Sequence, residues 1–268
     1  MVPGRTRLFA AASLVAALNG LATRISWSLS KGLWVSLSET LGVSGIVWLA
    51  LVIIVALALA ERDDQTARGR DWALALGVIA ISLLPSPALA GAALVPYAIW
   101  GVIDARSGSA QRAIASILLT LTLTLVWGPL ALRIMPELLG ADASMVAWIL
   151  GGQAQGNIYA SLDGHSRFMV APGCSSLNNM SLATILAVSL TRYFGLKVDP
   201  PIVLAIAAAS LATIAINVAR MAMIALHPST FDYWHHGAGS VFFGWLALFA
   251  IIAVIGVTID RRLRHAPH

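Results

Sequence analysis

Three side chains that can take part in covalent chemistry lie in the C-terminal half of the sequence, each at the edge of an apolar segment. Cys174, the single cysteine of the chain, lies in APGCSSLNN, Arg220 lies in INVARM and His235 lies in DYWHHGAG. A thiol can act as a nucleophile, an imidazole can accept and donate a proton near neutral pH, and a guanidinium can stabilise a negatively charged oxygen. Together these residue types predict acyl transfer from a peptide to the thiol.

Further residues are placed to support these groups. Ser175, or alternatively Ser176, can cap the helix that follows the cysteine, and the positive end of that helix dipole favours a thiolate. Asn217 precedes Arg220 by three residues and therefore lies on the same helix face. His236 provides a second imidazole directly beside the first, so the choice of the proton-carrying histidine stays open at this point.

Each of these residues also has an ordinary structural interpretation. A free cysteine often packs as a small apolar residue, and an arginine near the end of a membrane helix can extend to the interface. A pair of histidines beside Trp234 also fits the polar surface of a membrane. The catalytic interpretation therefore depends on whether the three segments meet in space.

The composition is that of a protein embedded in a lipid bilayer. Of 268 residues, 59% are hydrophobic and 11% are charged, whereas soluble domains contain about 25% charged residues. A soluble enzyme, a disordered chain and a collagen-like fibre are therefore excluded. The net charge of +5 is interpreted through membrane topology and not as a nucleic-acid signal.

Eight apolar segments are long enough, or nearly so, to cross about 30 Å of hydrocarbon. They are residues 7–23, 43–60, 72–85, 88–104, 113–134, 176–195, 201–223 and 236–258. The sequence therefore predicts an all-α polytopic membrane protein of about eight transmembrane helices, forming a single integral-membrane domain over residues 1–268. A seven-span alternative joins residues 72–104 into one helix kinked at Pro85 and Pro87. The first segment is expected to be a retained signal anchor.

The basic residues predict which side of the membrane each loop faces. With eight spans, alternate loops face opposite sides of the membrane. Twelve Lys and Arg residues lie on the side that holds both termini, and five lie on the other side. The positive-inside rule makes the larger set cytoplasmic, so both termini are expected in the cytoplasm. The outer ends of the last three spans then carry Cys174, Arg220 and His235 on the extracytoplasmic side.

The longest extracytoplasmic segment, residues 135–175, is expected to hold a small β-hairpin before the sixth span. NIYASL and SRFMVAP flank the turn residues Asp163 and Gly164, a pattern typical of two short strands. Residues 138–150 are expected to lie along the membrane interface, with Trp148 as an aromatic anchor.

The three motif segments resemble those of the exosortase/archaeosortase family of multipass membrane cysteine transpeptidases. The family's A-x-x-C-S-G-like, N-x-x-R and H-x-x-x-G motifs correspond here to Ala171-Pro-Gly-Cys174-Ser175-Ser176, Asn217-Val-Ala-Arg220 and His235-His-Gly-Ala-Gly239. Ser176 stands where the family usually has Gly, which changes the turn after the cysteine. The spacing to Gly239 favours His235 over His236, and the motif-bearing part covers about residues 150–245.

The resemblance implies a membrane-embedded cysteine transpeptidase or endopeptidase with Cys174, Arg220 and His235 as its catalytic residues. It implies cleavage of C-terminal sorting signals on exported proteins: a short motif such as Pro-Glu-Pro (PEP-CTERM), a transmembrane helix and a basic tail. The expected location is the inner, cytoplasmic membrane, with the active site on the outer face. The expected partners are such exported proteins and the lipid bilayer, and no cofactor, metal or nucleic acid is expected.

Other classes of function are the alternatives. A small-solute transporter would place ionisable residues near the bilayer midplane, where this sequence is almost wholly apolar. A non-catalytic assembly factor of an envelope or exopolysaccharide system would not depend on Cys174. A metal hydrolase is disfavoured because the cluster of His227, Asp232, His235 and His236 lacks a zinc-type spacing. Within the peptidase interpretation, transpeptidation and hydrolysis use the same cysteine and differ only in the acceptor.

Overall fold

The chain forms long helices and one small sheet, divided between two compact units. The computed structural model describes residues 4–38, 40–62, 65–84, 86–106 and 109–265. The first unit comprises residues 1–126 and 188–198, and the second comprises residues 127–187 and 199–268.

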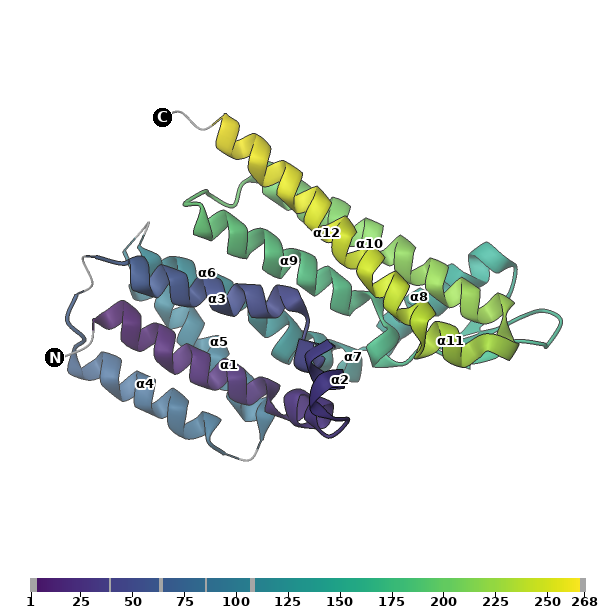
Figure 1. Ribbon diagram of the computed structural model, residues 1–268, viewed down its shortest axis with the longest axis horizontal. Helices are drawn as coiled ribbons and strands as arrows, with labels where there is room; N and C mark the ends of the chain where they lie inside the picture. Colours follow the sequence, from purple (N-terminus) through teal and green to yellow (C-terminus); the bar gives the residue numbers. More distant parts are fainter. Residues whose placement is uncertain (1–3, 39, 63–64, 85, 107–108, 266–268) are drawn as a thin grey trace. The chain divides into compact units, whose positions relative to one another are not determined.

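The first unit is a bundle in which α1 packs against α4 and α5, and α5 packs against α6 (Figure 1). Its elements are α1 (Arg5–Leu29), α2 (Leu33–Ser38), η1 (Thr40–Gly42), α3 (Gly45–Ala60), α4 (Gly69–Ser82), α5 (Pro87–Asp104) and α6 (Ala110–Thr122). Phe9 fits against α5 because Gly101 has no side chain: a Cβ there would lie 2.5 Å from the Phe9 ring. Tyr97 and Trp100 complete this aromatic cluster, with ring centroids 4.6 Å and 6.0 Å from that of Phe9.

A group of paired charges joins the first turn of α1 to α4 and α5. The Arg5 Nε donates to Asp71 Oδ1 at 3.0 Å, and the Arg5 guanidinium also pairs with Asp104. The other Asp71 oxygen accepts from the backbone N–H of Arg68 at 2.8 Å and so caps the start of α4. Since Asp71 is buried, these partners compensate the cost of removing its charge from water.

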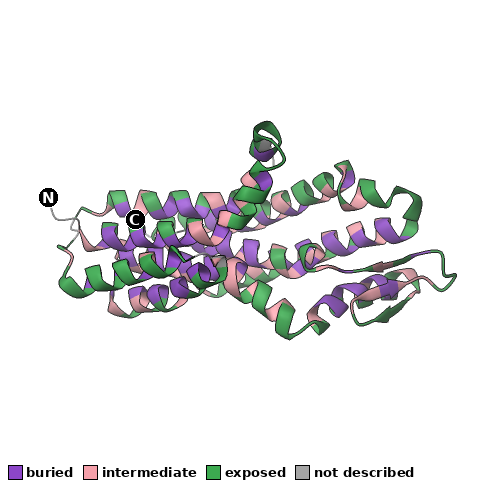
Figure 2. Ribbon diagram, turned by 90° about the horizontal axis from the view of Figure 1, so that it is seen from below, coloured by how far each residue is buried: buried purple, intermediate pink, exposed green. Residues whose placement is uncertain are grey.

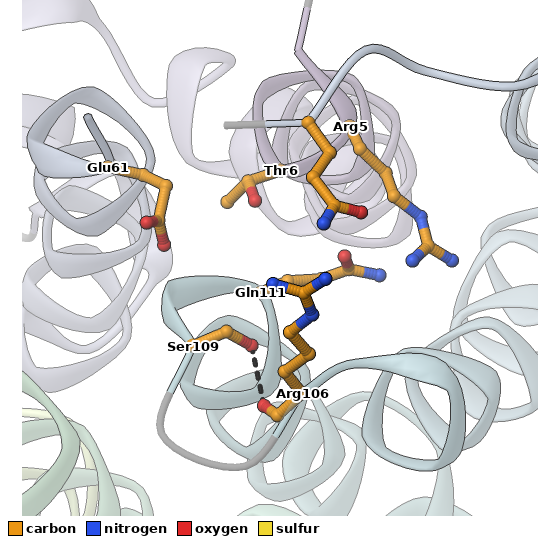
Figure 3. A pocket seen from close by; sticks show the side chains of 7 residues that line it. Arg5, Thr6, Glu61, Arg106, Ser109 and Gln111 are labelled. Atoms are coloured by element: carbon orange, nitrogen blue, oxygen red, sulfur yellow. Dashed lines mark hydrogen bonds between the residues drawn. The ribbon is translucent and has the colours of Figure 1, made fainter. Parts of the chain in front are cut away.

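A polar pocket lies at the end of the first unit where α1 and α6 begin and α3 ends (Figure 3). It is lined by Arg5, Thr6, Glu61, Gln65, Arg106, Ser109 and Gln111. The Glu61 carboxylate accepts from the backbone N–H of Ala110 at 3.0 Å, which ties the end of α3 to the start of α6. Ser109 donates to the carbonyl of Arg106 at 2.8 Å, the bond drawn in Figure 3.

The second unit contains the residues singled out from the sequence. A π-helical turn, η2 (Leu123–Trp127), connects α6 to its first helix. Its helices are α7 (Gly128–Ile134), α8 (Glu137–Leu150), η3 (Pro172–Cys174), the first part of α9 (Ser176–Tyr193), α10 (Pro200–Leu226), η4 (Pro228–Thr230), α11 (Phe231–His235) and α12 (Ala238–Arg264). α10 lies along α12 and also contacts α8 (Figure 1). Val146, Tyr159, Val170 and Met221 belong to the buried core between α8, the sheet and α10, and Cys174 packs against this core.

The sheet of the second unit has three antiparallel strands in the order β1–β2–β3. They are β1 (Gln153–Gln155), β2 (Ile158–Ala160) and β3 (Arg167–Met169), with Tyr159 opposite Phe168. β2 and β3 are joined across Asp163 and Gly164, and β1 is a third strand that the sequence did not indicate. The location of this sheet outside the membrane stays a prediction.

Four helical segments of the described chain are long and apolar enough to cross a membrane: α1, Ala110–Ile134, α10 and α12. α3 and α5 are shorter apolar helices. Figure 2 shows exposed residues along the helices. On α12 the exposed apolar side chains include Phe242 and Phe249, each 60% exposed. Outward-facing apolar side chains of this kind suit a lipid environment, so the chain is an all-α membrane protein.

The remaining predicted segments also coincide with helices, although the count of eight spans stays a prediction. α4 and α5 are separate helices, so residues 72–104 do not form one continuous helix as the seven-span alternative assumed. Pro85 lies outside the described residues.

Candidate active site

Cys174 lies at the junction between the sheet and α9. Pro172 begins the single turn η3, and the backbone N–H of Cys174 donates to the carbonyl of Ala171 at 2.8 Å. Ser175 then caps α9, because its hydroxyl accepts from the backbone N–H of Leu177 at 3.2 Å. Of the two serines considered from the sequence, Ser175 is therefore the cap.

His235 reaches the thiol from the short helix α11. Its Nε2 atom lies 3.3 Å from Cys174 Sγ, and its Nδ1 atom lies 2.7 Å from His236 Nε2. Phe231, one turn earlier on α11, stacks on the His235 ring with centroids 4.8 Å apart. His235 thus contacts both the thiol and His236.

Gly239 explains how α11 can pack against the start of α12. A Cβ at this position would lie 2.5 Å from Cε3 of the Trp234 ring, well inside van der Waals contact. The missing side chain therefore leaves space for Trp234, the residue just before His235. The glycine four positions after the histidine has a steric role in positioning α11.

Asn217 connects α10 to the turn that carries the cysteine. Its Nδ2 donates to the carbonyl of Cys174 at 2.8 Å and to the hydroxyl of Ser176 at 3.1 Å. Ser176 in turn donates to the Asp142 carboxylate, from its backbone N–H at 3.0 Å and from its hydroxyl at 2.6 Å. The hydroxyl of Ser176, the residue that stands where the family usually has Gly, thus both donates and accepts a hydrogen bond.

Asp142 was not singled out from the sequence, because residues 138–150 suggested an interfacial helix. The available signal was its occurrence in ELLGADASMVAWIL, where Glu137 opens the helix and Asp142 is the one acid beyond its first turn, among mostly apolar residues. An ionisable residue in such a stretch is a functional candidate by default.

Arg220 lines a cavity beside the cysteine turn, between α9, α10 and α12. The cavity is also bordered by Gly173, Ser175, Asn178, Asn179, Ile216, Asn217, Ser240, Phe243 and Gly244. Among the described residues, Arg220 Nε is buried without a hydrogen-bond partner, and no hydrogen bond joins Arg220 to Cys174 or His235. The guanidinium is therefore next to the cysteine turn with donor capacity to spare.

The environment of His235 favours its neutral form. Burial lowers the pKa of His235 below its ordinary value of 6.5, and the charges of His236 and Arg220 lower it further. Asp232 acts in the opposite direction with a smaller effect. At neutral pH the imidazole is therefore available to accept a proton.

The structure brings most of the predicted site residues into contact with one another and places Arg220 nearby. Cys174, His235, His236 and Asn217 form a connected set of contacts, and Ser175 shapes the turn beside them. Arg220 contributes its charge and a donor to the neighbouring cavity. This combination of a thiol, a base and a nearby cation can support attack on a carbonyl carbon.

A comparison with protein families identifies the chain. The family described as transmembrane exosortase matches residues 34–252. The chain belongs to the transmembrane exosortase family.

The exosortase match extends from α2 into α12 and includes Cys174, Arg220 and His235. Membership supports a general role as a membrane transpeptidase or protease and a location in a membrane. No curated protein and no solved structure matches the chain in the corresponding comparisons.

Proposed function

We propose that this exosortase is a membrane-embedded cysteine transpeptidase or endopeptidase that cleaves C-terminal sorting signals of exported proteins. The observation that carries the proposal is the 3.3 Å contact between Cys174 Sγ and His235 Nε2, within a chain of this family. The exported substrate ends in a short motif such as Pro-Glu-Pro, a transmembrane helix and a basic tail. Cleavage takes place at the extracytoplasmic face of the inner membrane.

The first step is proton transfer from the thiol to His235. The neutral imidazole accepts the proton of Cys174 at Nε2, and the thiolate attacks the scissile carbonyl. The carbonyl π pair moves to oxygen, and Arg220 donates to the resulting oxyanion from the adjoining cavity. The nucleophile, the base and the oxyanion donor are thus each assigned to one residue.

His236 has a defined place in this arrangement. A neutral imidazole that accepts at Nε2 carries its own proton on Nδ1. In His235 that Nδ1–H then donates to His236 Nε2 over 2.7 Å. We assign to His236 the role of the third group that orients the base, as in other nucleophile–base pairs.

The second step releases the tail of the substrate. The protonated His235 donates its Nε2 proton to the leaving amine, the C–N bond breaks and a thioester with Cys174 remains. Water or the nucleophile of an acceptor molecule then attacks the thioester and regenerates the thiol. Hydrolysis and transpeptidation therefore share every step up to the thioester.

The proposed topology comprises eight spans, with both termini in the cytoplasm and the Cys174 turn on the extracytoplasmic side. The charge distribution of the loops supports this orientation. The transmembrane helix of the substrate would lie in the bilayer beside the site, so that the short motif reaches the thiol from the same side. The three-stranded sheet, which ends five residues before Cys174, could add an extended motif as a further strand.

The proposal is tested by co-expressing the full chain with an exported reporter. The reporter carries the C-terminal region of a protein from the same genome that ends in a short motif, an apolar helix and a basic tail. The intact chain should shorten the reporter, and Cys174→Ala should abolish shortening. Arg220→Ala should slow it by about 10²–10³-fold, the usual effect of removing one oxyanion donor. Arg220→Lys should be nearly as damaging, because an ammonium cannot replace the planar guanidinium fork.

A matched control is Ser144→Ala on α8, which changes an exposed hydroxyl in the second unit and should leave processing unchanged. Normal shortening of the reporter by Cys174→Ala would overturn the proposal and favour the non-catalytic alternative.

A further inference from the structure

Asp142 is a buried carboxylate with an unusual set of partners. It lies on α8 with 2% of its surface exposed. Both of its hydrogen bonds come from one residue, Ser176, whose N–H and hydroxyl donate to its two oxygens. Among the described residues no cation pairs with it. Burying a charge in this way is costly, and the two hydrogen bonds from Ser176 offset part of that cost.

The position of Ser176 makes these two bonds structural determinants of α9. Ser176 is the first residue of α9, where backbone N–H groups have no partner within the helix. A negative charge is also favourable at this end of the helix dipole. The carboxylate therefore fixes where α9 begins relative to α8.

The same bonds extend to the cysteine through Asn217. The Ser176 hydroxyl that donates to Asp142 also accepts from Asn217 Nδ2, and Asn217 Nδ2 donates to the carbonyl of Cys174. Ser176 and Asn217 are 4% and 5% exposed, so this chain of bonds is shielded from water. It holds the backbone of Cys174 between α8 and α10.

His235 is positioned by different contacts. Its ring stacks on Phe231, and the preceding Trp234 packs against Gly239. The distance from thiol to imidazole therefore depends on two segments that different side-chain contacts hold in place. We propose that Asp142 is a positioning residue: through Ser176 and Asn217 it holds the turn of Cys174 where His235 can reach the thiol. This inference rests on the proposed role of the Cys174–His235 pair.

Electrostatics and positioning make opposite predictions for Asp142. A carboxylate at the start of α9 disfavours a nearby thiolate, so simple removal of its charge would make the thiol more reactive. Loss of positioning would instead uncouple the thiol from His235. The quantity that separates the two effects is the dependence of thiol reactivity on His235.

The experiment measures the rate of Cys174 alkylation by iodoacetamide in the purified full-length protein at neutral pH. Because Cys174 is the single cysteine, no other thiol contributes to the signal. We compare the rates with and without His235→Ala, first in the native background and then with Asp142→Asn. Asparagine keeps the shape, but its Nδ2 cannot accept from the N–H of Ser176. In the native background His235→Ala should slow alkylation, so the ratio of the rate without this change to the rate with it should exceed 1. In the Asp142→Asn background the same ratio should fall to about 1, as expected for coupled residues.

A second measurement uses the reporter. Asp142→Asn should lower kcat for reporter processing by about 10–100-fold with little change in KM, because a misplacement of about 1 Å can cost about 100-fold. Ser176→Ala, which removes the hydroxyl link but keeps the backbone bond, should have a smaller effect in the same direction. Ser176→Ala decides the outcome if Asp142→Asn does not fold.

The matched control is Asp71→Asn, which alters an equally buried carboxylate in the first unit. It should preserve the full dependence of alkylation on His235. Retention of that dependence in both Asp142→Asn and Ser176→Ala would overturn the positioning role while leaving the proposed function intact. Alkylation that is indifferent to His235 in the native background would overturn both.

Discussion

In the proposed mechanism His235 accepts the thiol proton of Cys174, and the environment of that imidazole determines the pH range in which it can do so. The pKa of His235 is lowered by burial and by the charges of His236 and Arg220. A lowered pKa keeps the imidazole neutral to more acidic pH. The acid limb of kcat/KM should therefore lie below 6.5, the ordinary value for histidine.

Replacing His236 tests both its charge and its hydrogen bond. His236→Gln keeps an acceptor for His235 Nδ1 but removes a group whose own protonation, as the pH falls, disfavours a proton on His235. The acid limb of reporter processing should shift to higher pH, with much of the maximal rate retained. His236→Ala removes the acceptor as well and should also reduce the maximal rate. A pH profile and maximal rate unchanged in both variants would overturn the proposed role of His236.

The sequence pointed to the residues proposed as catalytic, but not to the residue proposed to position them. Cys174, Arg220 and His235 have distinctive chemistry in short motifs, so their types and spacing are enough to select them as candidates. Asp142 lies 34 residues before its partner Ser176, and its importance arises only when α8 packs beside the start of α9. Non-local contacts of this kind are not contained in a local pattern.

At the scale of elements, the histidine depends on the packing of α11 against α12. Gly239→Ala should displace Trp234, because the added methyl group would overlap its ring. We expect a strong loss of reporter processing and slower alkylation of Cys174, together with a lower Tm. Gly256→Ala is the matched control on the same helix, since a Cβ at Gly256 meets no atom within 4 Å. There the helix propensity of alanine should leave stability equal or slightly increased.

Equal behaviour of the two glycine variants would contradict the steric role of Gly239.

The long helices themselves were predictable, because each coincides with a run of apolar residues. The strand β1 was not, because its residues are exposed and polar at Gln153 and Gln155, and only pairing with β2 makes it a strand.

For the whole molecule, the single cysteine allows a direct test of orientation. A membrane-impermeant thiol reagent applied to intact spheroplasts should label Cys174 from outside. In a Cys174→Ala background, His265→Cys places a thiol on the exposed C-terminal segment, which should react only after the membrane is permeabilised. The opposite pattern would invert the proposed topology.

Arg5 belongs to an ion-pair group with Asp71 and Asp104, and these partners lie far apart in the sequence. Asp71 lies 66 residues after Arg5, so the arginine is synthesised before either carboxylate. In the proposed topology its unpaired charge would then act on the orientation of the first predicted span. In the folded protein the same charge is paired and holds α1 in the bundle. Arg5→Gln should therefore weaken both the orientation of α1 and its packing against α4 and α5.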